Sequence, residues 1–346
     1  MIDEDKKKGR KPTLTGALAV NSKLSGAQAI LRHQIRGPES ILLLDDDAFL
    51  TGLKTGEVVL IRNDSISSSI RFHQQSNCDG SYGSEPGCGR PLGLRADAEG
   101  RSWVADAYLG IIRFSIHDGS FEVVVKPGTL DQLLFTHSSS RWERREHPLI
   151  LLDPLDGNGR GDSRLLALEL RTGKLRVLMD GLSFANSIEL HPDGQSVLLT
   201  ETAMARVHRY FLVGAKAGQS EMWAENLPGL PDNIRPGRSP GTFWIGYALV
   251  RHADAFSFPD FVQDKPWLRQ LIAQVIPSQW LEGMRSVIGQ PHGLISLHDA
   301  DGSITATLHD PSGQMVPGVS EVSERADGSL LLGHYYTPYL AQLDPF

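Results

Sequence analysis

One strand–turn–strand template recurs along the chain, and it restricts the fold more than any other feature of the sequence. The copies are SIELHPDGQSVLLTE (187–201), SEVSERADGSLLLGH (320–334), LGLRADAEGRSWVAD (92–106), DNIRPGRSPGTFWIG (232–246) and a looser one, ESILLLDDDAFLTG (39–52). In each copy apolar residues alternate at a period of two on both sides of a polar turn, which is the pattern of a β-hairpin. Asp193-Gly194 and Asp327-Gly328 are typical of these turns, because glycine accepts positive φ without steric cost.

The spacing of the copies indicates an all-β repeat protein. A further polar turn and strand follow each copy, so the unit is a four-stranded meander that recurs at steps of roughly 47 to 54 residues. Units of this size and strand number are typical of propeller blades. Five copies and one irregular region predict a six-bladed β-propeller. The region between blades two and four supplies later strands at 133–135 and 149–152 but no opening strand, so we expect a truncated third blade.

A segment near 257–285 departs from the strand pattern. Its apolar residues recur at three-to-four spacing around Pro266, which predicts one or two amphipathic helices inserted in blade five. The insertion could cap one face of the propeller or pack on its outer rim, and a lipid-facing role is a third, weaker alternative. We expect two parts in the chain: a flexible basic N-terminal stub at 1–13 and a single propeller domain at 14–346.

Composition and charge exclude several classes of protein. The net charge of −7 argues against a nucleic-acid partner, because phosphate binding needs a basic face. No apolar run approaches the length that spans a bilayer, and the charged N-terminus has no apolar stretch behind it, so it is not a signal peptide. The basic residues of the stub could mark a membrane-proximal end, so membrane association stays open. The sequence does not indicate an oligomeric state.

Two cysteines, Cys78 and Cys88, stand close together in a loop rich in glycine, serine and proline. They could form a disulfide, remain free thiols or contribute to a metal site. Zinc is disfavoured because no further Cys or His ligands stand at zinc-finger spacing. A disulfide would imply an oxidising compartment, and the glycosylation sequon at Asn63 points the same way.

Oxygen-bearing side chains recur where the blades open. They are Glu39, Asn186, Asp232, Asn233 and Glu321. The first strand of each propeller blade lines the central channel, so we expect these residues at one level of that channel. Carboxylate and amide oxygens are the ligands that Ca²⁺ prefers, and without a cation such carboxylates would repel one another. The pattern therefore predicts a bound divalent cation.

Several longer motifs carry a family resemblance. GPESI, CGRPLGLRADAEG, VADAYLG, HSSSRWERRE, ETAMARVHRYFL, NLPGLPDNIRP and LHDPSG resemble the adipocyte plasma membrane-associated proteins, a group in the strictosidine synthase-like branch of six-bladed propellers. The resemblance runs from about residue 14 to residue 346. More distantly, the chain is similar to paraoxonases and to gluconolactonase/regucalcin, which are calcium-dependent esterases and lactonases.

The resemblance implies a lumenal or extracellular propeller on an N-terminal membrane anchor, with arylesterase-type activity. It assigns the calcium ligands to Glu39, Asn186, Asp232 and Asn233, the same set that the repeats indicate. Two departures stand out: the anchor is absent from this sequence, and the Asn-Asp pair that opens blade three in the family is missing.

The leading hypothesis is a Ca²⁺-assisted hydrolase of small aryl esters or lactones. Asp232 is the first candidate to activate water or attack the substrate, and Glu321 is the second. No G-x-S-x-G nucleophile elbow occurs, which argues against a serine esterase. The alternative is a non-catalytic scaffold that binds a protein or lipid partner at a membrane, since fold alone does not fix function.

Overall fold

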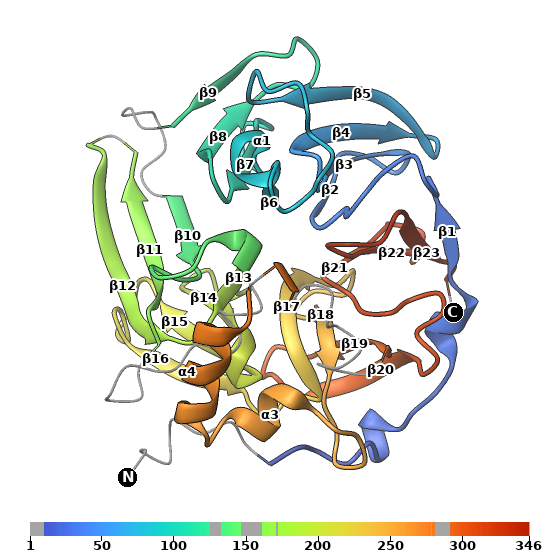
Figure 1. The fold of residues 1–346 in the computed structure, drawn as a ribbon, viewed down its shortest axis with the longest axis vertical. Helices are drawn as coiled ribbons and strands as arrows, with labels where there is room; N and C mark the ends of the chain where they lie inside the picture. Colours follow the sequence, from blue (N-terminus) through green and yellow to red (C-terminus); the bar gives the residue numbers. More distant parts are fainter. Residues whose placement is uncertain are drawn as a thin grey trace. The chain divides into compact units, whose positions relative to one another are not determined.

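The structure, a computed structural model, describes residues 10–124, 133–146, 161–170, 172–277, 279–280 and 291–345. Its strands form six antiparallel sheets, so the prediction of a six-bladed β-propeller is confirmed (Figure 1). The sheets belong to two compact units. Unit 1 comprises the described parts of Met1–Ser25, Gln132–Leu168 and Lys174–Val319, and unit 2 those of Gly26–Asp131, Glu169–Gly173 and Ser320–Phe346.

Unit 2 contains three four-stranded sheets. Two of them are consecutive meanders: β2 (Ile41–Leu43), β3 (Ala48–Gly52), β4 (Glu57–Arg62) and β5 (Ser65–Arg71), then β6 (Pro91–Ala96), β7 (Ser102–Asp106), β8 (Gly110–Phe114) and β9 (Phe121–Val123). The third combines β21 (Glu321–Glu324), β22 (Leu330–Gly333) and β23 (Leu340–Leu343) with β1 (Gln28–Ile30). In this last sheet β1 pairs antiparallel with β23, opposing Ala29 to Ala341, so both ends of the chain contribute to one blade.

Unit 1 also contains three sheets. Two are four-stranded: β13 (Ala185–Leu190), β14 (Ser196–Glu201), β15 (Arg206–Phe211) and β16 (Ser220–Ala224), then β17 (Gly229–Pro236), β18 (Phe243–Val250), β19 (Gly293–His298) and β20 (Ile304–Asp310). The other has three described strands, β10 (Leu133–His137), β11 (Ser163–Glu169) and β12 (Lys174–Leu182), in that order. The sequence predicts a later strand at 133–135, whereas β10 stands first in the described sheet and lies against β13, the opening strand of the next one. The strand expected at 149–152 lies outside the described residues.

Apolar side chains fill the spaces between neighbouring sheets of each unit. Strand β4 illustrates the pattern: Val58 and Leu60 belong to one buried cluster, and Val59 and Ile61 belong to another. Successive side chains of a strand point to opposite faces, so a strand covered on both faces needs a continuous apolar run. This explains the continuous apolar run of β4, whereas strands such as β5 keep exposed polar positions.

Two helices, α3 (Phe258–Val262) and α4 (Pro266–Val275), follow β18 and precede β19 in the chain, within the predicted insertion. Figure 1 shows them beside the sheet that contains both strands. Each has a proline in its first turn, where the missing N–H has no intrahelical partner to lose. Residues 278 and 281–290 lie outside the described residues. The shorter elements are α1 (Glu85–Cys88) and the 3-10 helices η2 (Gly16–Leu18), η3 (Lys23–Gly26), η4 (Arg144–Glu146) and η5 (Thr202–Met204). None of the described helices is long and apolar enough to span a bilayer.

The N-terminal segment lies against unit 1. Pro12 accepts a backbone hydrogen bond from Ala253 (2.9 Å), and the Lys11 ammonium donates to the carbonyl of Ala255. Of the stub predicted at 1–13, residues 1–9 lie outside the described residues.

Candidate functional site

Unit 1 brings Asn186 and Asp232 into contact. The Nδ2 atom of Asn186 donates a hydrogen bond to Oδ1 of Asp232 over 2.7 Å. Asp232 and the adjacent Asn233 are buried, with exposed fractions of 6% and 7%. Two of the predicted ligands therefore come from the opening strands of neighbouring sheets and are in contact, and Asn233 follows Asp232 in β17.

Bulges in the opening strands place these side chains. The β13–β14 register shifts between Ala185 and Ile188, and the β17–β18 register shifts between Pro231 and Ile234. Asn186 and the Asp232–Asn233 pair occupy these irregular positions. A bulge bends its strand and changes the direction of its side chains, so the same local device directs equivalent residues of two repeats.

Threonine hydroxyls of η5 and β14 hold the bulge of β17. Thr200 donates to the carbonyl of Asp232 over 2.9 Å, and Thr202 donates to the carbonyl of Pro231 over 2.6 Å. Both hydroxyls are buried, and each satisfies a backbone carbonyl where the β17–β18 register is irregular. The backbone of the candidate site is therefore fixed from the neighbouring sheet.

In unit 2, Glu39 has an arginine partner. The Arg90 side chain is fully buried and donates from Nη2 to Glu39 Oε2 over 2.9 Å. It also donates to the carbonyls of Gly37 and Tyr335, each over 3.1 Å. The Arg90 guanidinium therefore already supplies a positive charge beside Glu39. Sequence reasoning missed Arg90, although it lies in the CGRPLG motif.

Glu39 and Glu321 lie on either side of Gly333. A Cβ atom at Gly333 would stand 2.8 Å from the carbonyl oxygen of Glu39 and 3.1 Å from Cβ of Glu321. Glu321 opposes Gly333 in the β21–β22 ladder and is fully buried. The two acidic residues predicted for unit 2 are thus close neighbours because glycine leaves room for them.

Asp106 is a buried carboxylate that sequence reasoning did not select. Its Oδ1 accepts backbone hydrogen bonds from Tyr108 and Leu109, each 2.9 Å long. Its Oδ2 is buried and has no hydrogen-bond partner within the described part of the chain. Burial raises the pKa of the Asp106 carboxyl, against the opposing effects of these backbone bonds and of Arg90. Raised carboxyl pKa values are common at functional sites.

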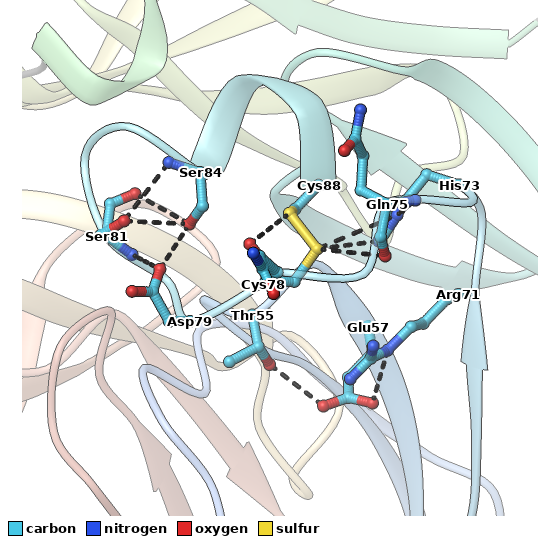
Figure 2. The surroundings of a disulfide bond; sticks show 11 residues. Thr55, Glu57, Arg71, His73, Gln75, Cys78, Asp79, Ser81, Ser84 and Cys88 are labelled. Carbon is cyan, nitrogen blue, oxygen red and sulfur yellow. Dashed lines mark hydrogen bonds and ion pairs between the residues drawn. A yellow bond between two sulfur atoms is a disulfide. The ribbon is translucent and has the colours of Figure 1, made fainter.

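The cysteines form a disulfide, one of the alternatives that the sequence left open. Figure 2 shows the Cys78–Cys88 bridge at the base of its loop, with His73 beside it. Nε2 of His73 lies 3.8 Å from Sγ of Cys78. Asp79 orders the loop by accepting hydrogen bonds from the Ser81 backbone N–H and the Ser84 hydroxyl, as Figure 2 also shows. Within the described residues, one group of three His, Cys, Asp or Glu side chains has its possible metal-ligand atoms within 4.8 Å of one another: His73, Cys78 and Cys88. The disulfide occupies both sulfurs, so this group is not a metal site.

Asn63 of the sequon lies at the exposed tip of the β4–β5 hairpin, in a turn where its φ is 48°. Asparagine tolerates this left-handed conformation better than most residues. The position is accessible to a modifying enzyme, and glycosylation stays a prediction.

The donor set of unit 1 fits a hard divalent cation. Asp232 supplies a carboxylate, and Asn186 and Asn233 supply amide groups. Because Asn186 gives its amide nitrogen to Asp232, its amide oxygen is the atom that would act as a ligand. Calcium takes oxygen ligands of this kind. Glu39 fits less well, since Arg90 already balances its charge.

Comparison with known proteins gives consistent matches over nearly the whole chain. The model of strictosidine synthase matches residues 122–215, and that of the strictosidine synthase-like N-terminal region matches residues 16–61. Adipocyte plasma membrane-associated protein from Salmo salar is 36% identical over 351 residues, covering 96% of this chain and 81% of the relative. The Rattus norvegicus protein of that name is 35% identical, with 96% and 89% covered. Protein strictosidine synthase-like 10 of Arabidopsis thaliana is 30% identical, with 89% and 85% covered.

Solved structures share the fold at low sequence identity. A structure described as a gluconolactonase from Xanthomonas campestris has a TM-score of 0.55 at 15% identity and covers 98% of this chain and 96% of its own. A calcium-binding protein, regucalcin, from Agrobacterium tumefaciens has a TM-score of 0.53 at 12% identity, with 91% and 92% covered. At these identities the likeness establishes the architecture.

Proposed function

This chain belongs to the strictosidine synthase-like family of six-bladed β-propellers, and from that membership we propose that it is a calcium-assisted hydrolase of aryl esters or lactones. The observation that carries the proposal is the partly buried hydrogen bond between Asn186 and Asp232, with Asn233 next to Asp232 in the chain. The likeness of the fold to a gluconolactonase and to a calcium-binding protein supports the substrate class and the metal.

The residues of unit 1 have distinct roles in this proposal. Asn186, Asp232 and Asn233 would hold the ion through one carboxylate and two amide oxygens. A bound calcium ion would polarise the substrate carbonyl and stabilise the negative charge that develops on its oxygen. Asp232 would accept a proton from the attacking water, and the Thr200 and Thr202 hydroxyls would keep its backbone in position. Glu321 is the second candidate for proton transfer.

An assay of phenyl acetate and a δ-lactone, with and without EDTA, tests the proposal. We expect hydrolysis that calcium restores after chelation, and a loss of about 100-fold or more in Asp232→Asn, because this change removes the proton acceptor but keeps the side-chain shape. Asp301→Asn, at an exposed turn of the same unit, is the matched control and should retain activity. Equal rates in EDTA and in calcium, or an active Asp232→Asn protein, would contradict the assignment.

A melting experiment separates metal binding from catalysis. A ligand that binds only the folded state raises the midpoint of thermal unfolding. We expect calcium to raise it in the wild-type protein and not in Asp232→Asn. If calcium raises both midpoints equally, the ion binds somewhere else.

We also place the protein on the lumenal or extracellular side of a membrane. Its relatives are named as plasma membrane-associated proteins, and the Cys78–Cys88 disulfide and the exposed sequon at Asn63 suit an oxidising compartment. In eukaryotic cells, an amidase that removes N-linked glycans should increase the gel mobility of the wild-type protein but not that of Asn63→Gln. No change in wild-type mobility would count against this location.

A further inference from the structure

Residues 12–23, which we call the N-terminal strap, lie beside β20 (Figure 1). β20 is the last strand of its described sheet, so one side of its backbone has no strand to pair with there. Asn21 replaces such a strand: its Nδ2 donates to the carbonyl of Thr307 over 2.8 Å, and its Oδ1 accepts from the N–H of His309 over 3.1 Å. Thr307 also donates from Oγ1 to the carbonyl of Ala17 over 2.8 Å.

Hydrogen bonds, and not apolar burial, hold the strap in place. None of its residues is buried, and the first buried side chain after it is Leu24. Its side chains from 12 to 22 carry no charge. A segment with few buried apolar contacts opens at a low cost in free energy, so a small change in the groups that bind the strap can release it.

Three histidines lie together beside the residues that bind the strap. His252 follows β18 and precedes Ala253, whose N–H donates to the carbonyl of Pro12 over 2.9 Å. His292 precedes β19, and its Nε2 lies 2.9 Å from Nδ1 of His309 in β20. The ring centres of His252 and His292 are 6.3 Å apart. One end of this sheet therefore gathers three titratable rings where the strap is attached.

The hydrogen bonds determine which nitrogen of His309 carries the hydrogen. The Thr307 hydroxyl gives its hydrogen to Ala17, so it accepts from Nε2 of His309, which lies 3.1 Å away. Nδ1 of His309 then has no hydrogen and accepts from Nε2 of His292. Donors therefore follow one another from His292 through His309 and Thr307 to the strap. This arrangement requires a neutral imidazole at His309.

Burial lowers the pKa of each of the three histidines. His309 is fully buried, and repulsion from charge on His292 and His252 adds to the effect, so that its pKa falls to about 4. The buried Nδ1 of His252 has no hydrogen-bond partner within the described residues, so a protonated ring would leave a donor unsatisfied there. All three rings are therefore neutral at pH 7 while the strap is bound.

The charged neighbours of the histidines act in opposite directions. Asp254, in the loop after β18, raises the pKa of His252, and Lys11, next to the strap, lowers it. Asp310 of β20 raises the pKa of His292, but its carboxylate already accepts hydrogen bonds from two serine hydroxyls and two backbone N–H groups. The arginine before His252 is paired with an aspartate of α3. These charges do not reverse the effect of burial.

We propose that acidification releases the N-terminal strap from the edge of β20, with His252, His292 and His309 as the groups that respond to pH. Protonation places like charges side by side and puts a hydrogen on Nδ1 of His309, where the ring accepts one in the bound state. The bound state therefore takes up fewer protons than the released state, in which water reaches the rings, and falling pH favours release. The proposal is independent of ester hydrolysis.

The pH range follows from the pKa values. The bound strap is fully stable above about pH 6.5, the ordinary pKa of histidine, and loses stability as the pH falls toward about 4, the pKa of His309. Release exposes the backbone N–H of His309 and the carbonyl of Thr307 at the edge of β20, because Asn21 no longer covers them.

Hydrogen–deuterium exchange of the full chain, measured by mass spectrometry at about pH 7.5 and about pH 5 in EDTA, tests the proposal. The rates are corrected for the intrinsic pH dependence of amide exchange. We expect exchange in peptides that cover 12–23 and 305–311 to become about tenfold faster, or more, at the lower pH. Peptides from β17 and β18, in the same unit, should exchange equally at both pH values.

Three variants complete the design. His292→Gln/His309→Gln keeps polar groups at both positions but removes the titrating rings, so the strap should stay protected at about pH 5. His117→Gln, in an exposed turn of unit 2, is the matched control and should behave like the wild type. Asn21→Ala removes two bonds to β20 and should release the strap at both pH values, which keeps the test decisive if the double variant does not fold.

Three results would overturn the proposal. The first is equal protection of 12–23 in the wild-type protein at both pH values. The second is the same loss of protection at about pH 5 in the wild type and in the double histidine variant, or continued protection of β20 in Asn21→Ala. The third is a simultaneous loss of protection in all peptides of unit 1, which would show acid unfolding of the whole unit.

Discussion

Arg90 changes the interpretation of Glu39 at the scale of single residues. The sequence predicts that the opening residue of blade one binds a metal ion, and in the structure its Oε2 lies 2.9 Å from the Arg90 guanidinium. A buried carboxylate needs a positive partner, and a protein can supply that partner itself. Breaking a buried pair by removing one member costs several kcal/mol, so loss of activity in a Glu39 variant would not by itself identify a calcium ligand.

The buried carboxyl of Asp106 predicts how the stability of the protein changes with pH. Burial raises the pKa of its carboxyl above the ordinary 3.8, so the folded state disfavours the ionised form. The stability that the neutral form provides is complete below pH 3.8 and is lost as the pH rises through the raised pKa. We therefore expect Asp106→Asn to be more stable than the wild type at pH 7, by about 1.4 kcal/mol for each unit of pKa shift, with no gain at pH 3.5.

Denaturant unfolding at several pH values measures this difference. Asp118→Asn is a control of opposite sign, because a hydrogen bond from Ser120 lowers the pKa of Asp118 to about 2, so that this variant should gain nothing at pH 7. An Asp106→Asn protein that is less stable than the wild type at pH 7 would show that the backbone bonds to Asp106 outweigh its burial.

At the scale of elements, Gly333 of β22 packs closely against the backbone of Glu39 and the side chain of Glu321. We expect Gly333→Ala to destabilise the protein by about 1–3 kcal/mol, because the new methyl group would meet the carbonyls of Glu39 and Pro38 at 2.8 and 3.0 Å. Gly83→Ala is the matched control, since its Cβ would meet nothing within 4 Å. Thermal unfolding of both variants decides the point, and equal midpoints would contradict the crowding at Gly333.

The sequence predicted the hairpins well because their signals are local. Gly119, Gly194, Gly302 and Gly328 all follow an aspartate and all have positive φ at turns between paired strands. The pairing of β1 with β23 and the contact of Arg90 with Glu39 were missed, because neither leaves a periodic or local pattern in the sequence. Asn186 and Asp232 were found because equivalent positions of the repeats carry them. The bulges that direct these two side chains leave no periodic signal in the sequence.

At the scale of the whole molecule, each unit combines segments that are distant in the sequence. Unit 2 contains both the first strand, β1, and the last, β23. We expect a chain that ends at Tyr339 to be insoluble or to melt far below the wild type, because it loses the buried Leu340 and leaves β1 and β22 without their partner. A chain that ends at Leu343 keeps β23 and should melt like the wild type. Similar melting of both truncated chains would show that β23 contributes little to stability.

The pairing of β1 with β23 also affects how the protein must be made. A ribosome releases β1 long before β23, so the first strand emerges well before its partner exists. During that interval its backbone N–H and C=O groups have no neighbouring strand to bond to. This blade therefore becomes complete only after β23 has emerged, and a chaperone that shields the waiting strand should raise the yield of folded protein.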